Sequence, residues 1–89
     1  MPFVSIPTPL RQHTGGQDSL EAQGATVGEA LADVTARFPD LKERLFDGEE
    51  VRRFVNVYVN NEDIRYLDEM DTAVKDGVIV ALIPAVAGG

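Results

Sequence analysis

Residues 78–89, VIVALIPAVAGG, contain the stretch that decides the fold. Both alternating sets of side chains from Val78 to Ile83 are apolar, whereas a strand buried on one face only alternates apolar with polar residues. Pro84 follows, and then come small residues and two glycines with no charged residue among them. The pattern predicts a last strand at the end of a body of residues 1–84, followed by a flexible tail of residues 85–89.

The segment 53–59 predicts the strand that neighbours this one. Valines at positions 55, 57 and 59 alternate with Phe54, Asn56 and Tyr58, which is the period of a strand. Residues 60–63, NNED, predict a turn, and residues 64–66 predict a short returning strand. Residues 71–74 fit a single helical turn, and Asp76-Gly77 is a strong turn signal before the last strand.

The N-terminal segment predicts a hairpin with a loose loop. Residues 2–7 read as a strand in which Val4 and Ile6 share one face. Gly15-Gly16 marks a turn, and residues 19–23 alternate again with Leu20 and Ala22 on one face.

The middle of the chain predicts one main helix. Thr26 stands three residues before Glu29, the spacing of a capping box, and Pro39 ends the helix near Phe38. An apolar stripe recurs at helical spacing, and it consists of Val27, Ala30, Leu31, Val34 and Phe38. A short second helix, capped by Asp40 with Glu43, is expected to bury Leu41 and Leu45. Residues 47–50, DGEE, predict a further turn.

These elements predict an α+β domain with a mixed four- to five-stranded sheet and one helix on one face. If the valines of residues 53–59 point to the helix, the opposite face carries an apolar patch of Phe54, Tyr58, Ile79, Ala81 and Ile83. Such a patch is typical of a docking site for a partner. The alternative is that loops or the short helix cover it.

Composition excludes several function classes. The chain has no cysteine, so disulfides and thiolate chemistry are absent, and its one histidine, His13, provides no His-based catalytic cluster or multi-histidine metal site. The net charge of −7 disfavours nucleic-acid binding, because phosphate contacts need clustered Lys and Arg. It favours either solubility alone or steering towards a basic partner. No apolar run of membrane-spanning length and no secretory leader occur, so we expect a cytoplasmic protein that does not bind membranes.

The order of elements, the Asp76-Gly77 turn and the ending PAVAGG resemble the small ubiquitin-like sulfur carriers of the MoaD/ThiS family, which have a β-grasp fold. Three segments are similar to the CysO-type subgroup, which serves thiocarboxylate-dependent cysteine biosynthesis: VSIPTPLRQHTGGQ, RFVNVYVNNEDIRY and PAVAGG. Molybdopterin carriers more often have two prolines before the final valine, and Ala85 departs from that pattern.

The resemblance implies that the carboxylate of Gly89 is the chemical handle. An E1-like adenylyltransferase/sulfurtransferase would adenylate it with ATP and Mg²⁺, and a sulfur donor would displace AMP to leave a thiocarboxylate. Gly88 and Gly89 lack Cβ atoms and can thread a narrow channel. Val86 would anchor in an apolar groove beside Ala87, and Pro84 would stiffen the exit from the strand.

For the cysteine type, the resemblance implies a pyridoxal-phosphate-dependent cysteine synthase as sulfur acceptor and a zinc metalloprotease that releases cysteine. The chain itself would be a cosubstrate without turnover, without a stably bound cofactor or metal, and a monomer when free. The sequence leaves open a molybdopterin, thiamine or tRNA-thiolation pathway. It also leaves open a ubiquitin-like modifier that forms isopeptide bonds to lysine, and a plain interaction domain.

Overall fold

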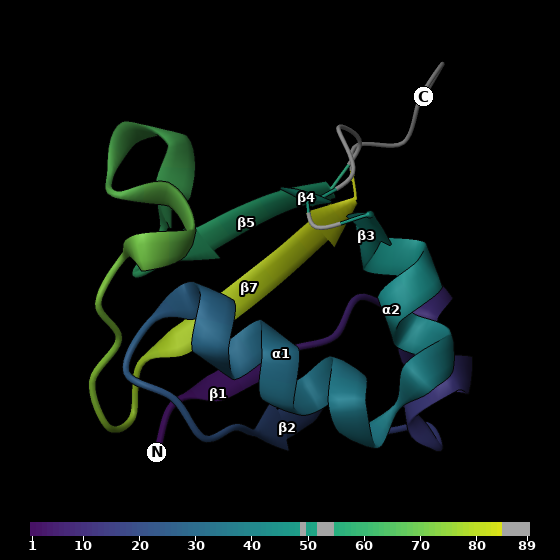
Figure 1. Ribbon diagram of the computed structural model, residues 1–89. Helices are drawn as coiled ribbons and strands as arrows, with labels where there is room; N and C mark the ends of the chain where they lie inside the picture. Colours follow the sequence, from purple (N-terminus) through teal and green to yellow (C-terminus); the bar gives the residue numbers. More distant parts are fainter. Residues whose placement is uncertain (49, 52–54, 85–89) are drawn as a thin grey trace.

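A computed structural model of the chain describes residues 1–48, 50–51 and 55–84 (Figure 1). In this part of the chain, five strands form a mixed sheet in the order β2-β1-β7-β5-β6. The parallel pair β1 and β7 lies inside the sheet, and the other neighbours are antiparallel. The strands are β1 (Phe3–Ser5), β2 (Ser19–Glu21), β5 (Val55–Val59), β6 (Glu62–Asp63) and β7 (Ile79–Pro84). This is the predicted β-grasp arrangement, and the structure adds that the last strand lies in the interior of the sheet.

Helix α1 (Val27–Arg37) lies across one face of the sheet (Figure 1). The Thr26 hydroxyl accepts a hydrogen bond from the backbone N–H of Glu29 at 3.2 Å, and the Glu29 carboxylate accepts one from the N–H of Ala25 at 2.9 Å. The first contact is the Thr26 cap that the spacing predicts, whereas the Glu29 carboxylate binds the N–H one residue before the N-cap rather than that of Thr26 itself. The helix ends before Phe38, as the following proline predicts.

Helix α2 (Pro39–Leu45) buries Leu41 and Leu45 as predicted, but its cap is different. Phe38 occupies the N-cap position without a side-chain hydrogen bond, and Pro39 begins the helix, so the prediction that Asp40 caps it is wrong. A proline in the first turn costs no backbone bond, because its missing N–H would have had no partner there. The turn predicted after α2 joins two short strands, β3 (Phe46–Asp47) and β4 (Glu50–Val51).

Three connections differ from the prediction. The expected loose N-terminal loop contains a 3₁₀ helix, η1 (Thr8–Thr14), in which the buried Thr14 hydroxyl lies 3.1 and 2.8 Å from two backbone carbonyl oxygens. Asn60 and Asn61 alone make the turn after β5, both at positive φ, so β6 begins within the predicted turn. The expected returning strand is therefore a 3₁₀ helix, η2 (Ile64–Tyr66), and the expected helical turn is η3 (Glu69–Asp71), two residues early.

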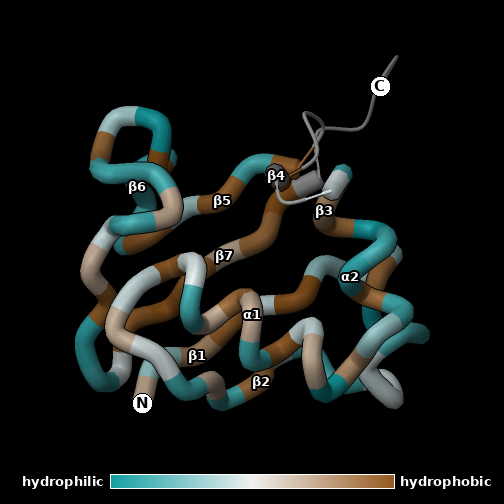
Figure 2. The backbone as a smooth tube through the Cα atoms, viewed as in Figure 1, coloured by the Kyte–Doolittle hydropathy of each residue, from teal (hydrophilic) through white to brown (hydrophobic). Residues whose placement is uncertain are grey.

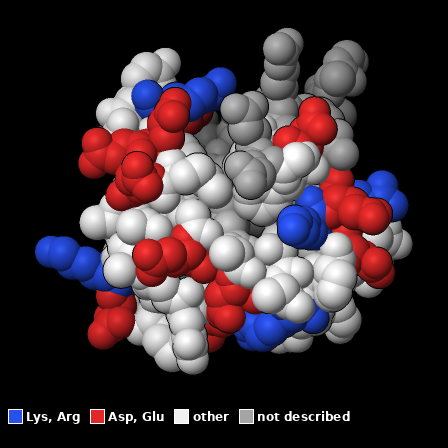
Figure 3. Space-filling model, viewed as in Figure 1, with Lys and Arg blue, Asp and Glu red and all other residues white. Residues whose placement is uncertain are grey.

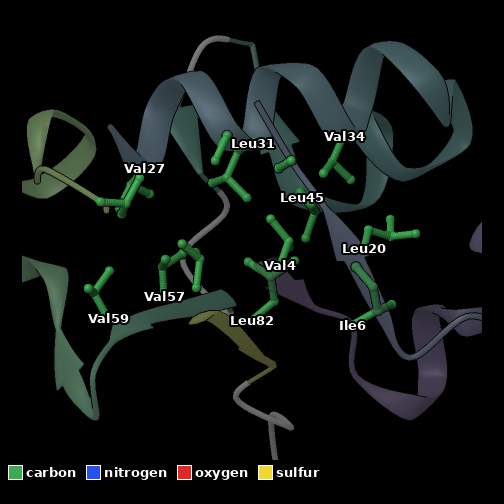
Figure 4. Close-up of a cluster of buried hydrophobic side chains, with 14 of the residues drawn as sticks. Val4, Ile6, Leu20, Val27, Leu31, Val34, Leu45, Val57, Val59 and Leu82 are labelled. Carbon is green, nitrogen blue, oxygen red and sulfur yellow. The ribbon is translucent and has the colours of Figure 1, made fainter. Parts of the chain in front are cut away.

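The core lies between α1 and the sheet. Figure 2 shows the hydrophobic residues concentrated in β1, β5 and β7 and recurring along α1, and Figure 4 shows their side chains meeting between the two layers. The apolar stripe of α1 and the valines of β5 both contribute to this core, as predicted. Phe38, at the end of the stripe, is only partly buried. The fully buried side chains of the core include Val4, Ile6, Val27, Leu31, Val34, Leu41 and Val80.

Gly24 joins β2 to α1 at a point where no side chain fits. Its φ is +153°, and a Cβ atom placed there would lie 2.7 Å from the backbone nitrogen of Ala30 and from the Cβ of Glu29. The missing side chain therefore lets the connection pass against the first turn of α1. Arg37 of α1 then binds the carbonyl of Glu21 at the end of β2, and Asp33 accepts a hydrogen bond from the N–H of Gln23 just beyond the strand.

Candidate functional site

The chemical handle predicted from the sequence lies outside the described residues. Gly88, Gly89, Val86 and Ala87 follow the last described position, and Phe54 also falls in a part of the chain that the structure does not describe. Pro84 closes β7, and its backbone pairs with that of Val55 in β5. The structure therefore defines the strand that leads to the handle.

Strand β7 is held on both of its edges. It pairs in parallel with β1, where Val80 lies opposite Val4, and antiparallel with β5, where Leu82 lies opposite Val57. The side chains of Val80 and Leu82 are 0% and 3% exposed on the helix side. Because both edges and one face are occupied, the position and direction of the chain at residue 84 are set by the body of the protein.

The other face of β7 is open among the described residues. Ile79 and Ile83 are 54% and 47% exposed, although both are large and apolar, and Ala81 between them is half-buried. Tyr58 lies directly opposite Ala81 in β5 and is also half-buried. The described members of the predicted patch, Tyr58, Ile79, Ala81 and Ile83, thus share one face, and neither α1 nor α2 lies over it (Figure 1).

Two further residues lie on this face but were not included in the predicted patch. Phe3 of β1 lies opposite Ile79 and is half-buried, so it widens the patch by one strand. Its alternation with the buried Val4 and Ile6 was the available signal. Asn56 lies opposite Ile83 and marks the polar side of the patch.

A fixed ion pair borders the patch at the β5–β6 hairpin. The Arg65 guanidinium donates from Nη2 to Asp63 Oδ2 at 2.7 Å and to Asn56 Oδ1 at 3.0 Å, and its Nε lies 3.1 Å from Asp63 Oδ1. Asp63 is buried, whereas Arg65 is 64% exposed. The hydrogen bonds from Arg65 hold the pKa of Asp63 below its usual value, and the same contacts raise the pKa of Arg65.

The residues that the structure describes contain no other candidate for chemistry. Among them, no group of three or more His, Asp or Glu side chains is placed to hold a metal ion. His13 lies in η1, where its ring nitrogen is 3.5 Å from the Gln12 side-chain amide. No helix in the same ranges combines the length and apolar character needed to cross a membrane.

Several known proteins are similar to this chain over most or nearly all of its length. A family model described as the ThiS family matches residues 4–89. Sulfur carrier protein CysO of Mycobacterium tuberculosis is 49% identical, over 97% of this chain and 96% of that protein. In the crystal structure of the Amycolatopsis orientalis BexX/CysO complex, one chain matches with a TM-score of 0.91 and 52% identity, and the match covers 100% of both chains. Small archaeal modifier protein 3 of Haloferax volcanii is 43% identical over 73% of this chain and 71% of that protein.

Proposed function

This chain belongs to the ThiS family, and from that membership we propose that it is a sulfur carrier whose C-terminal Gly89 is converted to a thiocarboxylate. The observation that carries the proposal is the family match that runs through residue 89, because it includes the terminal diglycine. The 49% identity to a sulfur carrier over nearly the whole chain supports the same function. In this role the chain is a protein cosubstrate, with residues 1–84 as its body and residues 85–89 as its reactive tail.

The proposed activation follows from the chemistry of a carboxylate. A carboxylate is a poor electrophile, so one of its oxygens first attacks the α-phosphorus of ATP on a partner enzyme, and pyrophosphate leaves. A sulfide-level donor then adds to the acyl carbon, and AMP leaves with the electrons of the C–O bond. ATP and Mg²⁺ belong to the activating partner. Glycine at positions 88 and 89 lets the carboxylate approach the nucleotide through a narrow channel, because it has no Cβ atom.

The open face is the proposed docking surface for this partner. Ile79 and Ile83 expose apolar area beside Tyr58 and Ala81, at the strand that delivers the tail. Covering that area releases free energy of about 25 cal/mol per Å². This gain offsets the entropy that is lost when the tail is ordered in the partner's active site. Phe54, Pro84, Val86 and Ala87 complete the proposed contact set on sequence grounds.

Cysteine biosynthesis is the proposed pathway, since CysO proteins from two organisms match this chain over nearly its whole length at 49% and 52% identity. The thiocarboxylate sulfur would pass to a pyridoxal-phosphate-dependent cysteine synthase, and a zinc metalloprotease would release cysteine from the carrier. The Amycolatopsis orientalis CysO forms a complex with BexX, which supports docking onto a partner protein as the mode of action. The need for ATP favours a cytoplasmic location, and the open face favours a free monomer that is available to partners.

A second candidate function is protein modification. The 43% identity to a small archaeal modifier protein favours it, because the same activated carboxylate can form an isopeptide bond to lysine. Lysine-linked conjugates of the chain in its native cells would support this function.

Intact-mass measurement tests the carrier. The chain isolated from cells with its activating enzyme should contain a species heavier by the difference between one sulfur and one oxygen atom. Deletion of Gly89 should remove this species, whereas Gly16→Ala, in the turn after η1 where a Cβ meets open space, should retain it. A deletion variant that still supports sulfur transfer would contradict both the carrier and the modifier.

A further inference from the structure

A second surface feature adjoins the open face at the β5–β6 hairpin. A shallow pocket of about 500 Å³ is lined by Tyr58, Asn61, Glu62, Asp63, Arg65 and Tyr66. Tyr66 is 86% exposed, which leaves a large aromatic ring in water. Neither the packing of the core nor the proposed activation chemistry accounts for this ring.

The charge of the pocket is uneven. Asp63 is neutralised by Arg65, whose Nε and Nη2 atoms both reach its carboxylate. Glu62 is exposed and forms no ion pair within the described ranges. With two carboxylates and one guanidinium, the lining therefore carries a formal charge of −1, and the carboxylate without a counter-ion is Glu62.

The shape and the groups of the pocket suit a planar cation. Tyr58 and Tyr66 provide aromatic surfaces on which a guanidinium can stack, and such contacts are more frequent for arginine than for lysine. Glu62 can accept two parallel hydrogen bonds from a guanidinium, and the side-chain oxygen of the exposed Asn61 offers a further acceptor. Because the hydrogen bonds of Arg65 to Asp63 and Asn56 hold it in place, it serves as a rigid wall of the pocket.

The pocket and the open face are continuous. Tyr58 lines the pocket, and it also lies opposite Ala81 on the open face. A protein that covers Ile83 and Ala81 would therefore lie close enough to place a neighbouring side chain of its own in the pocket. On the helix side of the molecule, acidic side chains lie over the η2–η3 segment with basic side chains beside them (Figure 3), and the net charge of −7 favours a basic partner.

We propose that this pocket receives an arginine side chain of the protein that docks on the open face. The inference deepens the proposed function, because the docked protein is the activating enzyme of that proposal. The open face supplies apolar contact, and the arginine fixes the orientation of the carrier so that β7 points at the enzyme's nucleotide site. Glu62 and Tyr66 are then specificity-determining residues for partner choice.

Charge reversal at a matched pair of sites tests the proposal. Glu62→Lys and Asp40→Lys change the net charge equally, but Asp40 is an exposed residue of α2, on the helix side of the sheet. In ATP–pyrophosphate exchange by the cognate activating enzyme, Glu62→Lys should lower kcat/KM about tenfold or more through KM, and Asp40→Lys about twofold or less. Tyr66→Ala should also raise KM, whereas Leu67→Ala, at the exposed neighbour outside the pocket, should not.

The outcomes separate the two proposals. If the wild-type chain supports exchange but Glu62→Lys behaves like Asp40→Lys, the pocket inference is overturned and the carrier function stands. If the wild-type chain supports no exchange, the carrier function fails, and titration with N-acetyl-arginine amide decides the pocket by itself. That probe should shift the backbone amide resonances of Glu62 and Tyr66 more than N-acetyl-lysine amide does, and Tyr66→Ala should abolish the shifts. Equal shifts with both probes, or none, would overturn the assignment to arginine.

Discussion

The two faces of β7 carry similar side chains in opposite environments. Val80 and Leu82 are buried under α1, whereas Ile79 and Ile83, one residue away in each case, are about half exposed. A side chain on the helix side contributes its hydrophobic free energy when the chain folds. A side chain on the open side leaves about half of its area exposed, and the matching part of that free energy stays available for association with a partner. Buried and exposed apolar side chains therefore alternate along the same strand, and the proposed docking would use the exposed set.

The largest effect should follow from a cavity on the helix side. Leu31 is fully buried, so Leu31→Ala should lower the free energy of unfolding by about 3 kcal/mol. Urea denaturation followed by circular dichroism measures the loss. Ile79→Ala on the open face serves as the control and should cost well under half as much. Equal losses from the two variants would contradict the division between the faces.

A smaller loss is expected where a side chain is added on the helix side. Gly24→Ala places a Cβ 2.7 Å from backbone and side-chain atoms of α1 at a positive φ, so we expect a loss of about 2 kcal/mol. The same denaturation experiment measures it. Gly16→Ala, also at positive φ but in open space, isolates the backbone strain from the clash. If Gly24→Ala lowers the free energy of unfolding no more than Gly16→Ala does, the close approach of residue 24 to α1 does not affect stability.

On the open face the effect should appear in binding. The double variant Ile79→Thr and Ile83→Thr keeps β-branched residues in the strand and removes apolar surface, so stability should stay nearly constant. The affinity for the activating enzyme should fall about tenfold, or 1.4 kcal/mol. Isothermal titration calorimetry measures this change. A double variant that unfolds readily but binds normally would reverse the assignment of the two faces.

The helix cap offers a sharper test of how α1 is held over the sheet. Thr26→Ala removes the acceptor for the N–H of Glu29 and should cost about 1 kcal/mol. Thr26→Ser keeps the hydroxyl oxygen and should recover most of the loss. Thermal unfolding of the three proteins compares them directly, and an alanine variant as stable as the serine variant would exclude the cap as a source of stability.

The smallest effect should be a pH dependence at the margin of the open face. The pKa of Asp63 is lowered by Arg65, so its contribution to stability is present above the carboxyl's ordinary pKa near 4 and is lost as the pH falls through the folded-state value. Wild-type protein should therefore be more stable than Asp63→Asn at pH 7, and the difference should shrink as the pH approaches 3. Urea midpoints at both pH values measure it. A constant difference would show that the charge of Asp63 does not contribute.

The periodic parts of the fold were predictable from the sequence. The two-residue period predicted β1, β5 and β7, and the helical spacing of apolar residues predicted α1. The structure contains all four elements. The open face was predictable for the same reason, since two apolar sets on one strand exceed what a single helix can cover.

The unpredicted parts depend on contacts between distant or irregular segments. The hydrogen bonds from Arg65 to Asp63 and Asn56 form because β6 pairs with β5 after a turn of only two asparagines. No periodic pattern in the sequence predicts that register. The 3₁₀ helix η1 is stabilised in part by one threonine hydroxyl. Helix α2 begins at Pro39, whose ring fixes φ at a helical value, so Phe38 is its N-cap. The prediction instead relied on the preference of Asp40 for the N-cap position.

The interior position of β7 also has a mechanical consequence. A pull on the carboxyl end acts along the strand and loads its ladders with β1 and β5 in shear, so several hydrogen bonds must break together rather than one after another. In the proposed function, a partner enzyme that draws the end of the chain into its active site would therefore work against a body that resists unravelling. A carrier held by its carboxyl end would therefore stay folded while the partner acts on it.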